Sequence, residues 1–163
     1  MAKRRLDFKR NQKVLLPNNR TISISIIYHP GAVIIAPFLN NDTLIMMRQF
    51  RPALNKYIYE LPAGTLETDE PIAVCARREL LEETGLKSRK LVKLGAIYPV
   101  PGYSTEIIHV FKATELTLTQ AQPEDYEVIE TFAMTRLQVQ EMFKQGKLMD
   151  AKSICALAFC GWL

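Results

Sequence analysis

A helix that ends in three glutamates constrains this chain more than any other feature of its sequence. The segment Pro71–Thr84 is predicted to form that helix, because its opening proline suits a first turn and Gly85 suits the position just past the last turn. Glu79, Glu82 and Glu83 fall in the last turn, and residues spaced by three and four share one face of a helix. Three like charges therefore crowd the helix end at which the dipole favours cations.

Such an arrangement breaks two local rules at one place, which indicates a functional reason. Hard divalent cations supply one, because Mg²⁺ is normally held by a few carboxylates together with the phosphates of a substrate. The competing interpretation is a solvated acidic face that Arg77 and Arg78 screen. An apolar stripe of Ala73, Ala76 and Leu80 runs beside the acidic one. This stripe predicts a helix that lies on a sheet with its carboxylates at the edge of a cleft.

The rest of the chain predicts strands and helices that do not alternate regularly. Thr21–Tyr28 alternates isoleucine with serine, which is the period of a half-buried strand. Two short apolar runs, Ala32–Pro37 and Leu44–Arg48, predict a hairpin around the turn residues Asn40–Asp42. This mixture predicts an α+β fold, an α/β/α sandwich with a mixed β-sheet, rather than a doubly wound sheet. The remaining predicted strands and helices are Leu91–Tyr98, Ile107–Ala113, Val128–Met134, Arg136–Gln145 and a helix that begins near Asp150.

The glutamate helix is part of a longer pattern with fixed spacing. From residue 64 the pattern runs as glycine, glutamate, an Arg-Glu-apolar triplet, a glutamate pair and a Gly-apolar pair. The chain fills these nine positions with Gly64, Glu70, Arg78, Glu79, Leu80, Glu82, Glu83, Gly85 and Leu86. This arrangement resembles the Nudix box, G-x5-E-x7-R-E-U-x-E-E-x-G-U with U apolar, and every specified position matches. The resemblance implies a Nudix-type hydrolase of a nucleoside diphosphate linked to a further group.

The resemblance also implies a metal site. Glu79 and Glu83 would be the main ligands of Mg²⁺, with Mn²⁺ as a substitute, and Glu82 would lie close by. The backbone carbonyl of Ala63 would complete the site.

Four residues of the box would be structural. By resemblance, Glu70 and Arg78 form an ion pair that orients the helix. Gly64 allows a sharp turn into the helix, and Gly85 ends it.

A run downstream of the box narrows the substrate. Pro101 stands fifteen residues beyond the box in Tyr98–Glu106, a PGxSxE-like stretch. This resembles the ADP-ribose and sugar-nucleotide pyrophosphatase branch of the family. The branch implies hydrolysis of the pyrophosphate of a nucleoside diphosphate sugar, with ADP-ribose going to AMP and ribose 5-phosphate, and with GDP-mannose or another sugar nucleotide as the alternative. Four other stretches agree with this branch: residues 28–33, 48–51, 60–64 and 150–153.

Four residues are candidates for contact with the substrate. Arg51 suits a phosphate clamp, because a guanidinium binds oxyanions through two parallel hydrogen bonds; the competing interpretation is a surface arginine on a strand. Tyr28 is the favoured ring for stacking on adenine. Pro101 and Glu106 belong to the run that would shape the wall beside the sugar. Other rings that could stack are Phe50, Tyr57, Tyr98 and Tyr103.

Hydrolysis also needs a general base to activate water. In this branch the base often comes from an acidic loop beyond the box, here residues 124–130. We expect Glu127 first and Glu124 next, and Glu82 from within the box is the competing candidate. A solvated acidic loop at the start of a strand remains the structural alternative.

Charge and cysteine content bear on partners and compartment. The net charge of +4 is concentrated in residues 1–13, which carry six basic side chains against Asp7, so that residues 14–163 sum to −1. We therefore expect a basic N-terminal tail followed by one Nudix domain, with nucleic acid an unlikely partner. No apolar run reaches the roughly 18–20 residues of a membrane helix. Three cysteines without CxxC spacing predict reduced packing residues in a cytoplasmic protein.

Two further expectations concern assembly and activity. By resemblance the protein would be a homodimer that pairs through N-terminal strands, although the region before Tyr28 is short for a large exchanged domain. The alternative of another class is a Nudix-fold module that senses ADP-ribose or a sugar nucleotide without cleaving it. Such modules typically lose glutamates of the box, whereas Glu79, Glu82 and Glu83 are all present here.

Overall fold

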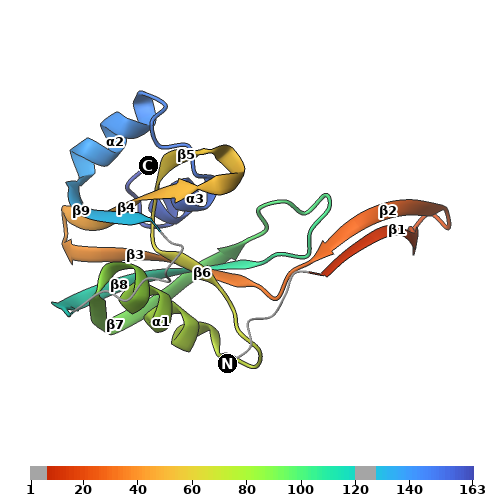
Figure 1. Ribbon diagram of the computed structural model, residues 1–163, viewed down its shortest axis with the longest axis horizontal. Coiled ribbons are helices and arrows are strands. Elements are labelled where there is room, and N and C mark those ends of the chain that lie inside the picture. The colour runs from red at the N-terminus through yellow and green to blue at the C-terminus, as the bar shows by residue number, and fades with distance from the viewer. Residues whose placement is uncertain (1–6, 120–127) are drawn as a thin grey trace.

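The computed structural model describes residues 7–119 and 128–163. Their strands form a seven-stranded mixed sheet and a separate two-stranded hairpin. Helix α1 (Ile72–Thr84) lies on one side of the large sheet, and α2 (Arg136–Lys144) and α3 (Ala151–Phe159) lie on the other (Figure 1). The predicted α+β sandwich is therefore confirmed. The strands are β1 (Asp7–Leu15), β2 (Thr21–Tyr28), β3 (Ala32–Asn40), β4 (Thr43–Arg51), β5 (Lys56–Glu60), β6 (Ala63–Thr65), β7 (Leu86–Ile97), β8 (Ile108–Leu118) and β9 (Ile129–Thr135).

Strand β3 is the centre of the sandwich, because its side chains point alternately to the two faces of the sheet. Ile34 and Ala36 belong to the apolar cluster that α2 and α3 cover. Val33 and Ile35 belong to the cluster that α1 covers. All four side chains are buried, as expected of a strand enclosed on both faces.

The pairing of β3 with its neighbours opens the sheet at one end. Strands β3 and β8 are parallel, whereas every other pairing in the sheet is antiparallel. Strands β3 and β4 form a hairpin, but they pair only next to the turn, at Phe38–Leu44 and Asn40–Thr43. Away from the turn, β3 pairs with β6, and β4 pairs with β5 and β9. The start of β3 and the end of β4 therefore diverge.

Strands β1 and β2 form a hairpin that projects from the main body (Figure 1). Its base is tied to the loop after β7. The amide of Ile27 donates to the carbonyl of Tyr103 at 2.8 Å, and the amide of Thr105 donates to the carbonyl of Ile27 at 3.0 Å. The hairpin and this loop are thus joined by backbone hydrogen bonds.

Most predicted elements are confirmed, with differences at their ends. The strand Thr21–Tyr28 and the hairpin of β3 and β4 form as expected, and Gly85 ends α1. The predicted basic tail needs correction, because its residues from Asp7 to Lys13 belong to β1. Strands β5 and β6 were not expected. In the described part of the chain, no helix is long and apolar enough to cross a membrane.

Candidate active site

Helix α1 brings its glutamates to the end of the sheet at which β3 and β4 diverge. Its N-cap is a proline, and Gly85 ends it in the left-handed conformation at φ 69°, which an L side chain rarely adopts. Ala76 and Leu80 of the predicted apolar stripe are fully buried, and Cys75 completes it against the sheet. Ala73 is only half-buried. This packing directs the last turn of α1 toward strand β6.

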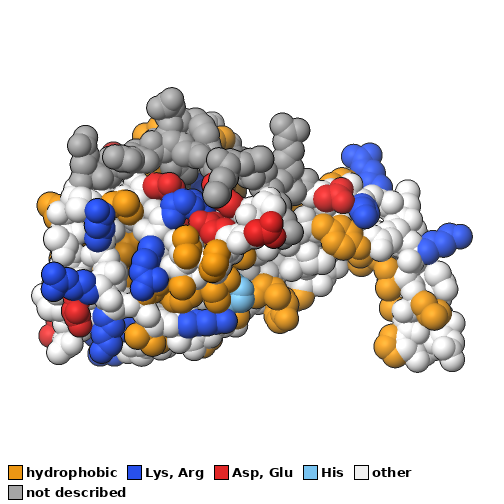
Figure 2. Space-filling model, turned by 90° about the horizontal axis from the view of Figure 1, so that it is seen from below, with side chains coloured by type: hydrophobic (Ala, Val, Ile, Leu, Met, Phe, Trp, Pro, Cys, Tyr) orange, Lys and Arg blue, Asp and Glu red, His pale blue; other side chains and the backbone are white. Residues whose placement is uncertain are grey.

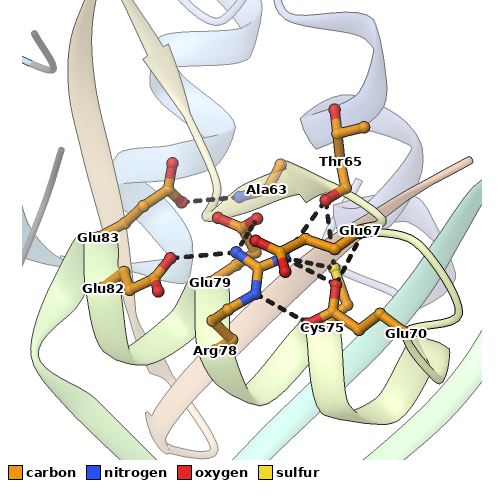
Figure 3. A network of polar contacts seen from close by, with 9 residues as sticks. All are labelled: Ala63, Thr65, Glu67, Glu70, Cys75, Arg78, Glu79, Glu82 and Glu83. Atoms are coloured by element: carbon orange, nitrogen blue, oxygen red, sulfur yellow. Dashed lines mark hydrogen bonds and ion pairs between the residues drawn. The ribbon is translucent and has the colours of Figure 1, made fainter. Parts of the chain in front are cut away.

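Arg78 on α1 holds three carboxylates together, two from the helix and one from the loop before it (Figure 3). Its Nε and Nη2 donate to the two carboxylate oxygens of Glu70 at 2.8 and 2.9 Å. Its Nη1 donates to Glu79 Oε1 at 2.7 Å and to Glu82 Oε2 at 3.1 Å. The guanidinium thereby offsets the repulsion between the crowded glutamates. The hydrogen bonds from Arg78 lower the pKa of Glu70 to about 2, and the same contacts raise the pKa of Arg78.

The carboxylates of Glu83 and Glu79 also lie against the segment between β5 and α1. The amide of Ala63 donates to Glu83 Oε2 at 2.9 Å, and the side chain of Glu83 is buried (Figure 3). A Cβ atom added to Gly64 would lie 1.9 Å from the carboxyl carbon of Glu79. Only glycine therefore allows this carboxylate to approach the backbone so closely. Glu79 and Glu83 thus converge on the peptide segment of Ala63 and Gly64.

The donors at this place suit a hard divalent cation. Carboxylate oxygens and a backbone carbonyl are the ligands that Mg²⁺ and similar ions take in proteins. Within residues 7–119 and 128–163, no three His, Cys, Asp or Glu side chains form a group that could hold a metal ion unaided. Backbone, water or substrate oxygens would therefore have to complete the coordination, as is usual for Mg²⁺.

A pocket of about 210 Å³ opens beside the Ala63–Gly64 segment, where β3 and β4 diverge. Strands β3, β4, β6 and β8, the loop before β8, and the first turn of α3 all contribute to its wall. Both cationic and anionic side chains face it, so it suits a ligand that carries phosphates and hydroxyl groups. The lining residues are Ala32, Val33, Arg51, Ala63, Gly64, Thr65, Glu106, Ile108 and Lys152.

The two cations of this pocket share one buried carboxylate. Arg51 donates from Nε and Nη2 to the two oxygens of Glu60, both at 2.6 Å. Lys152 Nζ also contacts Glu60, and it donates to Asp150 Oδ1 at 2.8 Å. Burial alone would raise the pKa of Glu60, but the hydrogen bond from Arg51 and the charge of Lys152 outweigh it and lower that pKa. The hydrogen bond with Glu60 raises the pKa of Arg51.

The first turn of α3 fixes the loop that precedes Ala63. Asp150 caps this helix by accepting a hydrogen bond from the amide of Ser153 at 3.0 Å. The hydroxyl of Ser153 accepts a hydrogen bond from the amide of Leu61 at 2.8 Å. Ser153 and Leu61 are both fully buried. Helix α3 therefore sets the position of the segment on which the glutamates of α1 converge.

Comparison with known sequences assigns the family. A model of the NUDIX domain matches residues 28–156. The chain belongs to the Nudix family. The matched region contains both the Arg78 network and the pocket. Nudix hydrolases generally use divalent metal ions, which agrees with the donors around the Ala63–Gly64 segment.

Several relatives of this Nudix chain are known. It is 37% identical over 150 residues to the ADP-ribose pyrophosphatase of Bacillus subtilis, covering 91% of this chain and 81% of that protein. It is 34% identical over 148 residues to the methanol dehydrogenase activator of Bacillus methanolicus, covering 90% and 80%. It is 35% identical over 141 residues to the GDP-mannose pyrophosphatase of Escherichia coli, covering 79% and 72%. A crystal structure described as an ADP compounds hydrolase shares the fold, with a TM-score of 0.80, 17% identity and coverage of 98% and 94%.

The Nudix pocket gathers some of the predicted substrate residues and leaves others out. Arg51 and Glu106 line it, together with the predicted metal-site segment of Ala63 and Gly64. Glu106 Oε1 lies 3.5 Å from His29 Nε2, while His29 Nδ1 accepts a hydrogen bond from the amide of Gly31.

Two of the predicted substrate residues lie elsewhere. Tyr28 is on the hairpin, where its hydroxyl donates to Gln12 Oε1 at 2.8 Å and Lys9 lies over its ring. Pro101 is exposed in the loop after β7. Neither Tyr28 nor Pro101 is among the described residues that line the pocket.

Of the three candidates for the base, only Glu82 lies within the described residues. Glu127 and Glu124 lie outside the described residues. Glu82 is on α1, half-buried and paired with Arg78.

Two charged residues of this Nudix site, Glu60 and Lys152, were assigned no role from the sequence. The stretches that contain them, residues 60–64 and 150–153, were noted only as typical of the branch. A glutamate that follows the aromatic run of β5 was a usable signal, because a carboxylate in a buried position requires a cation. Its partner could not be inferred, since Lys152 is 92 positions away.

Proposed function

We propose that this Nudix protein is a Mg²⁺-dependent pyrophosphatase of nucleoside diphosphate sugars, with ADP-ribose as its preferred substrate and AMP and ribose 5-phosphate as products. One observation carries the proposal: Glu79 and Glu83 converge on the Ala63–Gly64 segment at the mouth of a pocket that also holds Arg51. Carboxylates for a metal and a guanidinium for phosphate thus lie together. The relatives named ADP-ribose and GDP-mannose pyrophosphatase support the substrate class.

The side chains of the site divide the work of hydrolysis. Glu79, Glu83 and the carbonyl of Ala63 would hold Mg²⁺, with Glu82 close by and Mn²⁺ as a substitute. When bound, the ion neutralises phosphate charge and lowers the pKa of a coordinated water. Arg51 would hold the phosphate oxygens in the orientation for attack by water at one phosphorus, with departure of the bridging oxygen.

Further residues would act on the nucleoside, the sugar and the attacking water. Glu106 would accept a hydrogen bond from a sugar hydroxyl. Tyr28 and Pro101 would contact the substrate only from outside the pocket wall described here. Glu127 would take the proton from the attacking water, with Glu124 and then Glu82 as the other candidates.

A substrate panel tests the proposal. Formation of the nucleotide products is measured by chromatography with ADP-ribose, GDP-mannose, UDP-glucose, NADH, diadenosine polyphosphates and 8-oxo-dGTP, with and without Mg²⁺. We expect the highest kcat/KM for ADP-ribose or another sugar nucleotide and no turnover without a divalent ion. A best substrate of the triphosphate class, by about tenfold or more, would overturn the branch assignment.

The same panel addresses the two alternatives. A preference for GDP-mannose would identify the protein as a GDP-mannose pyrophosphatase, the alternative activity within the branch. Binding of ADP-ribose without release of AMP would identify a sensor module. The intact set of box glutamates favours catalysis.

We further propose that the protein is a homodimer that pairs through the β1–β2 hairpin. Phe8, Leu15 and Ile22 on this hairpin are large apolar side chains exposed by 41% or more. Figure 2 shows hydrophobic side chains along the projecting hairpin, among lysines and arginines. A strand pair that leaves apolar side chains in water gains stability when a second surface covers it.

A cytoplasmic location is part of the proposal. The cysteines Cys75, Cys155 and Cys160 are free, which agrees with a reducing compartment.

A further inference from the structure

We propose that Glu60 is a positioning residue of the catalytic site, which sets the orientation of Arg51 and Lys152 along the pocket wall. The inference rests on the proposed function, because it concerns how the site holds the pyrophosphate. Glu60 does not line the pocket, so it would act only through the two cations that do.

Burial of Glu60 is difficult to explain by stability alone. Its side chain is 0% exposed, and taking a carboxylate out of water costs several kcal/mol even when it is paired. Replacement of such buried ion pairs by apolar residues is often neutral or stabilising. A charge kept at this place therefore indicates a role other than holding the fold together.

The geometry of the contacts indicates that role. Glu60 takes the Nε and Nη2 donors of Arg51 in a two-pronged contact, which fixes the plane of the guanidinium. Among the residues that the structure describes, Nη1 of Arg51 has no hydrogen-bond partner and can donate to a ligand. Lys152 directs two of its three N–H donors to Glu60 and Asp150, so within the same residues one donor is left. Two cations with free donors thus face one pocket in fixed orientations.

The remaining donors belong to side chains on two different elements of the fold. Arg51 reaches the pocket from the end of β4, and Lys152 reaches it from the first turn of α3. Glu60 joins the two elements through one carboxylate. Since Asp150 also holds Lys152 and caps α3, the orientation of Arg51 is tied to the helix that fixes Leu61.

A second arginine–glutamate pair provides a matched control. Arg48 lies on the same strand as Arg51 and donates to Glu130 Oε2 at 3.3 Å. Both of these side chains are more than one third exposed, and neither lines the pocket. Arg48→Lys thus makes the same change as Arg51→Lys on the same strand, without changing the proposed site.

The test is a double-mutant cycle on Glu60→Gln and Arg51→Lys, with kcat and KM measured on the best substrate of the panel. Gln keeps the shape of Glu60, and Lys keeps the charge of Arg51 while losing its two-pronged geometry. We expect each single variant to lower kcat by about tenfold or more, because binding groups in the wrong orientation no longer align the phosphates for attack. KM should change by less than about threefold in Glu60→Gln. Loss of the donor orientation weakens binding of the substrate, but the pocket becomes one unit more positive and attracts its phosphates more strongly.

The double variant decides the question. If Glu60 acts through Arg51, the double variant should have about the kcat of the worse single variant. Additive losses, or a Glu60→Gln protein with a lower melting temperature but unchanged kcat, would overturn the proposal. Arg48→Lys should keep kcat within about twofold of the unmodified protein. Should Glu60→Gln fail to fold, Glu60→Asp gives the same cycle, because its shorter side chain keeps the charge but cannot reach both cations.

The activity of the unmodified protein distinguishes failure of this inference from failure of the proposed function. If it hydrolyses no nucleotide of the panel, the same cycle is measured by calorimetry on binding of inorganic pyrophosphate with Mg²⁺. Arg51→Lys should then weaken binding by about fivefold or more in the presence of Glu60, and by less than about twofold in the Glu60→Gln protein. Equal weakening in both would overturn the positioning role.

Discussion

At the scale of single residues, two charged side chains organise the site in opposite senses. Arg78 is one cation that holds three carboxylates, and Glu60 is one carboxylate that holds two cations. They lie on either side of the Ala63–Gly64 segment, Arg78 on α1 and Glu60 at the end of β5. The helix side thus offers oxygens for a metal, and the strand side offers donors for phosphate.

Glu83→Gln tests whether the glutamates of α1 bind the metal ion. Gln keeps the shape and the amide contact from Ala63 but removes a charge that Mg²⁺ needs, so we expect kcat to fall by at least about a hundredfold. The circular dichroism spectrum and the melting temperature should change little. Glu141→Gln, an exposed carboxylate on α2, is the control and should be fully active. Near-normal turnover of Glu83→Gln with Mg²⁺ would contradict the assignment of Glu83 as a ligand.

The identity of the base is a separate question at this scale. If Glu127 supplies it, Glu127→Gln should lower kcat strongly and leave KM and the Mg²⁺ dependence little changed, because a base acts in the transition state. Glu124→Gln should be milder. The three variants Glu127→Gln, Glu124→Gln and Glu82→Gln are compared at saturating Mg²⁺. A nearly silent Glu127→Gln beside a severe Glu82→Gln would move the base into the box.

Not all site residues could be predicted from the sequence, and the reason is physical. The glutamates of the box stand within one helical turn, so their spacing alone places them on one face. Glu60 and Lys152 come together only because β4 diverges from β3 and because α3 packs back on the sheet. No local pattern contains that information, since it depends on contacts between distant parts of the chain.

At the scale of elements, the loop before α1 is held to the helix by an ion pair and by hydrogen bonds. Glu70 precedes the helix and binds Arg78, and its Oε2 also accepts a hydrogen bond from the amide of Glu67 at 3.0 Å. This carboxylate therefore restrains the loop together with the hydrogen bonds that Arg78 Nη2 and Cys75 Sγ donate to the carbonyl of Thr65, where the loop begins. Because the pKa of this carboxylate is about 2 in the folded protein, its contribution depends on pH in a predictable direction.

Glu70→Gln tests that contribution. A folded-state pKa below the ordinary 4.5 stabilises the folded protein above pH 4.5, and the stabilisation is lost as the pH falls from 4.5 toward 2. We expect the variant to lose about 1–2 kcal/mol of unfolding free energy at pH 7 and clearly less at pH 3. Urea unfolding at both pH values measures the difference. An equal difference at the two pH values would show that the charge of Glu70 is not responsible.

Two of the strands that were not predicted, β1 and β6, have sequences that lack a pattern of their own. β1 has mostly exposed polar residues without alternation, and β6 has three residues, one of them glycine. Each forms because a neighbouring strand offers hydrogen-bonding partners, β2 for β1 and β3 for β6. The strands that were predicted, such as β2 and β3, have apolar side chains that specify a buried face.

At the scale of the whole molecule, the projecting hairpin of β1 and β2 forms a sheet of its own outside the sandwich. Three of its apolar side chains, Phe8, Leu15 and Ile22, are exposed, and its base is hydrogen-bonded to the loop that leads to Glu106. Assembly through the hairpin would thus act close to the pocket.

Phe8→Asp tests the proposed dimer. A charge placed in the centre of an apolar interface opposes its burial, so we expect the dimer dissociation constant to rise by at least about tenfold. Sedimentation over a range of concentrations measures this. Leu137→Asp, which changes an exposed apolar side chain on α2, should leave the dimer intact. A protein that sediments as a monomer without any substitution would refute the dimer itself.

The position of Arg78 has a consequence for how the protein matures. Its guanidinium already neutralises part of the charge on Glu79 and Glu82, so the last turn of α1 does not need a cation from solution in order to form. Many small metalloproteins fold only around their ion. We therefore expect this chain to complete its fold without the ion that is proposed to bind at Glu79 and Glu83, so that a shortage of metal would lower activity and leave the folded protein intact.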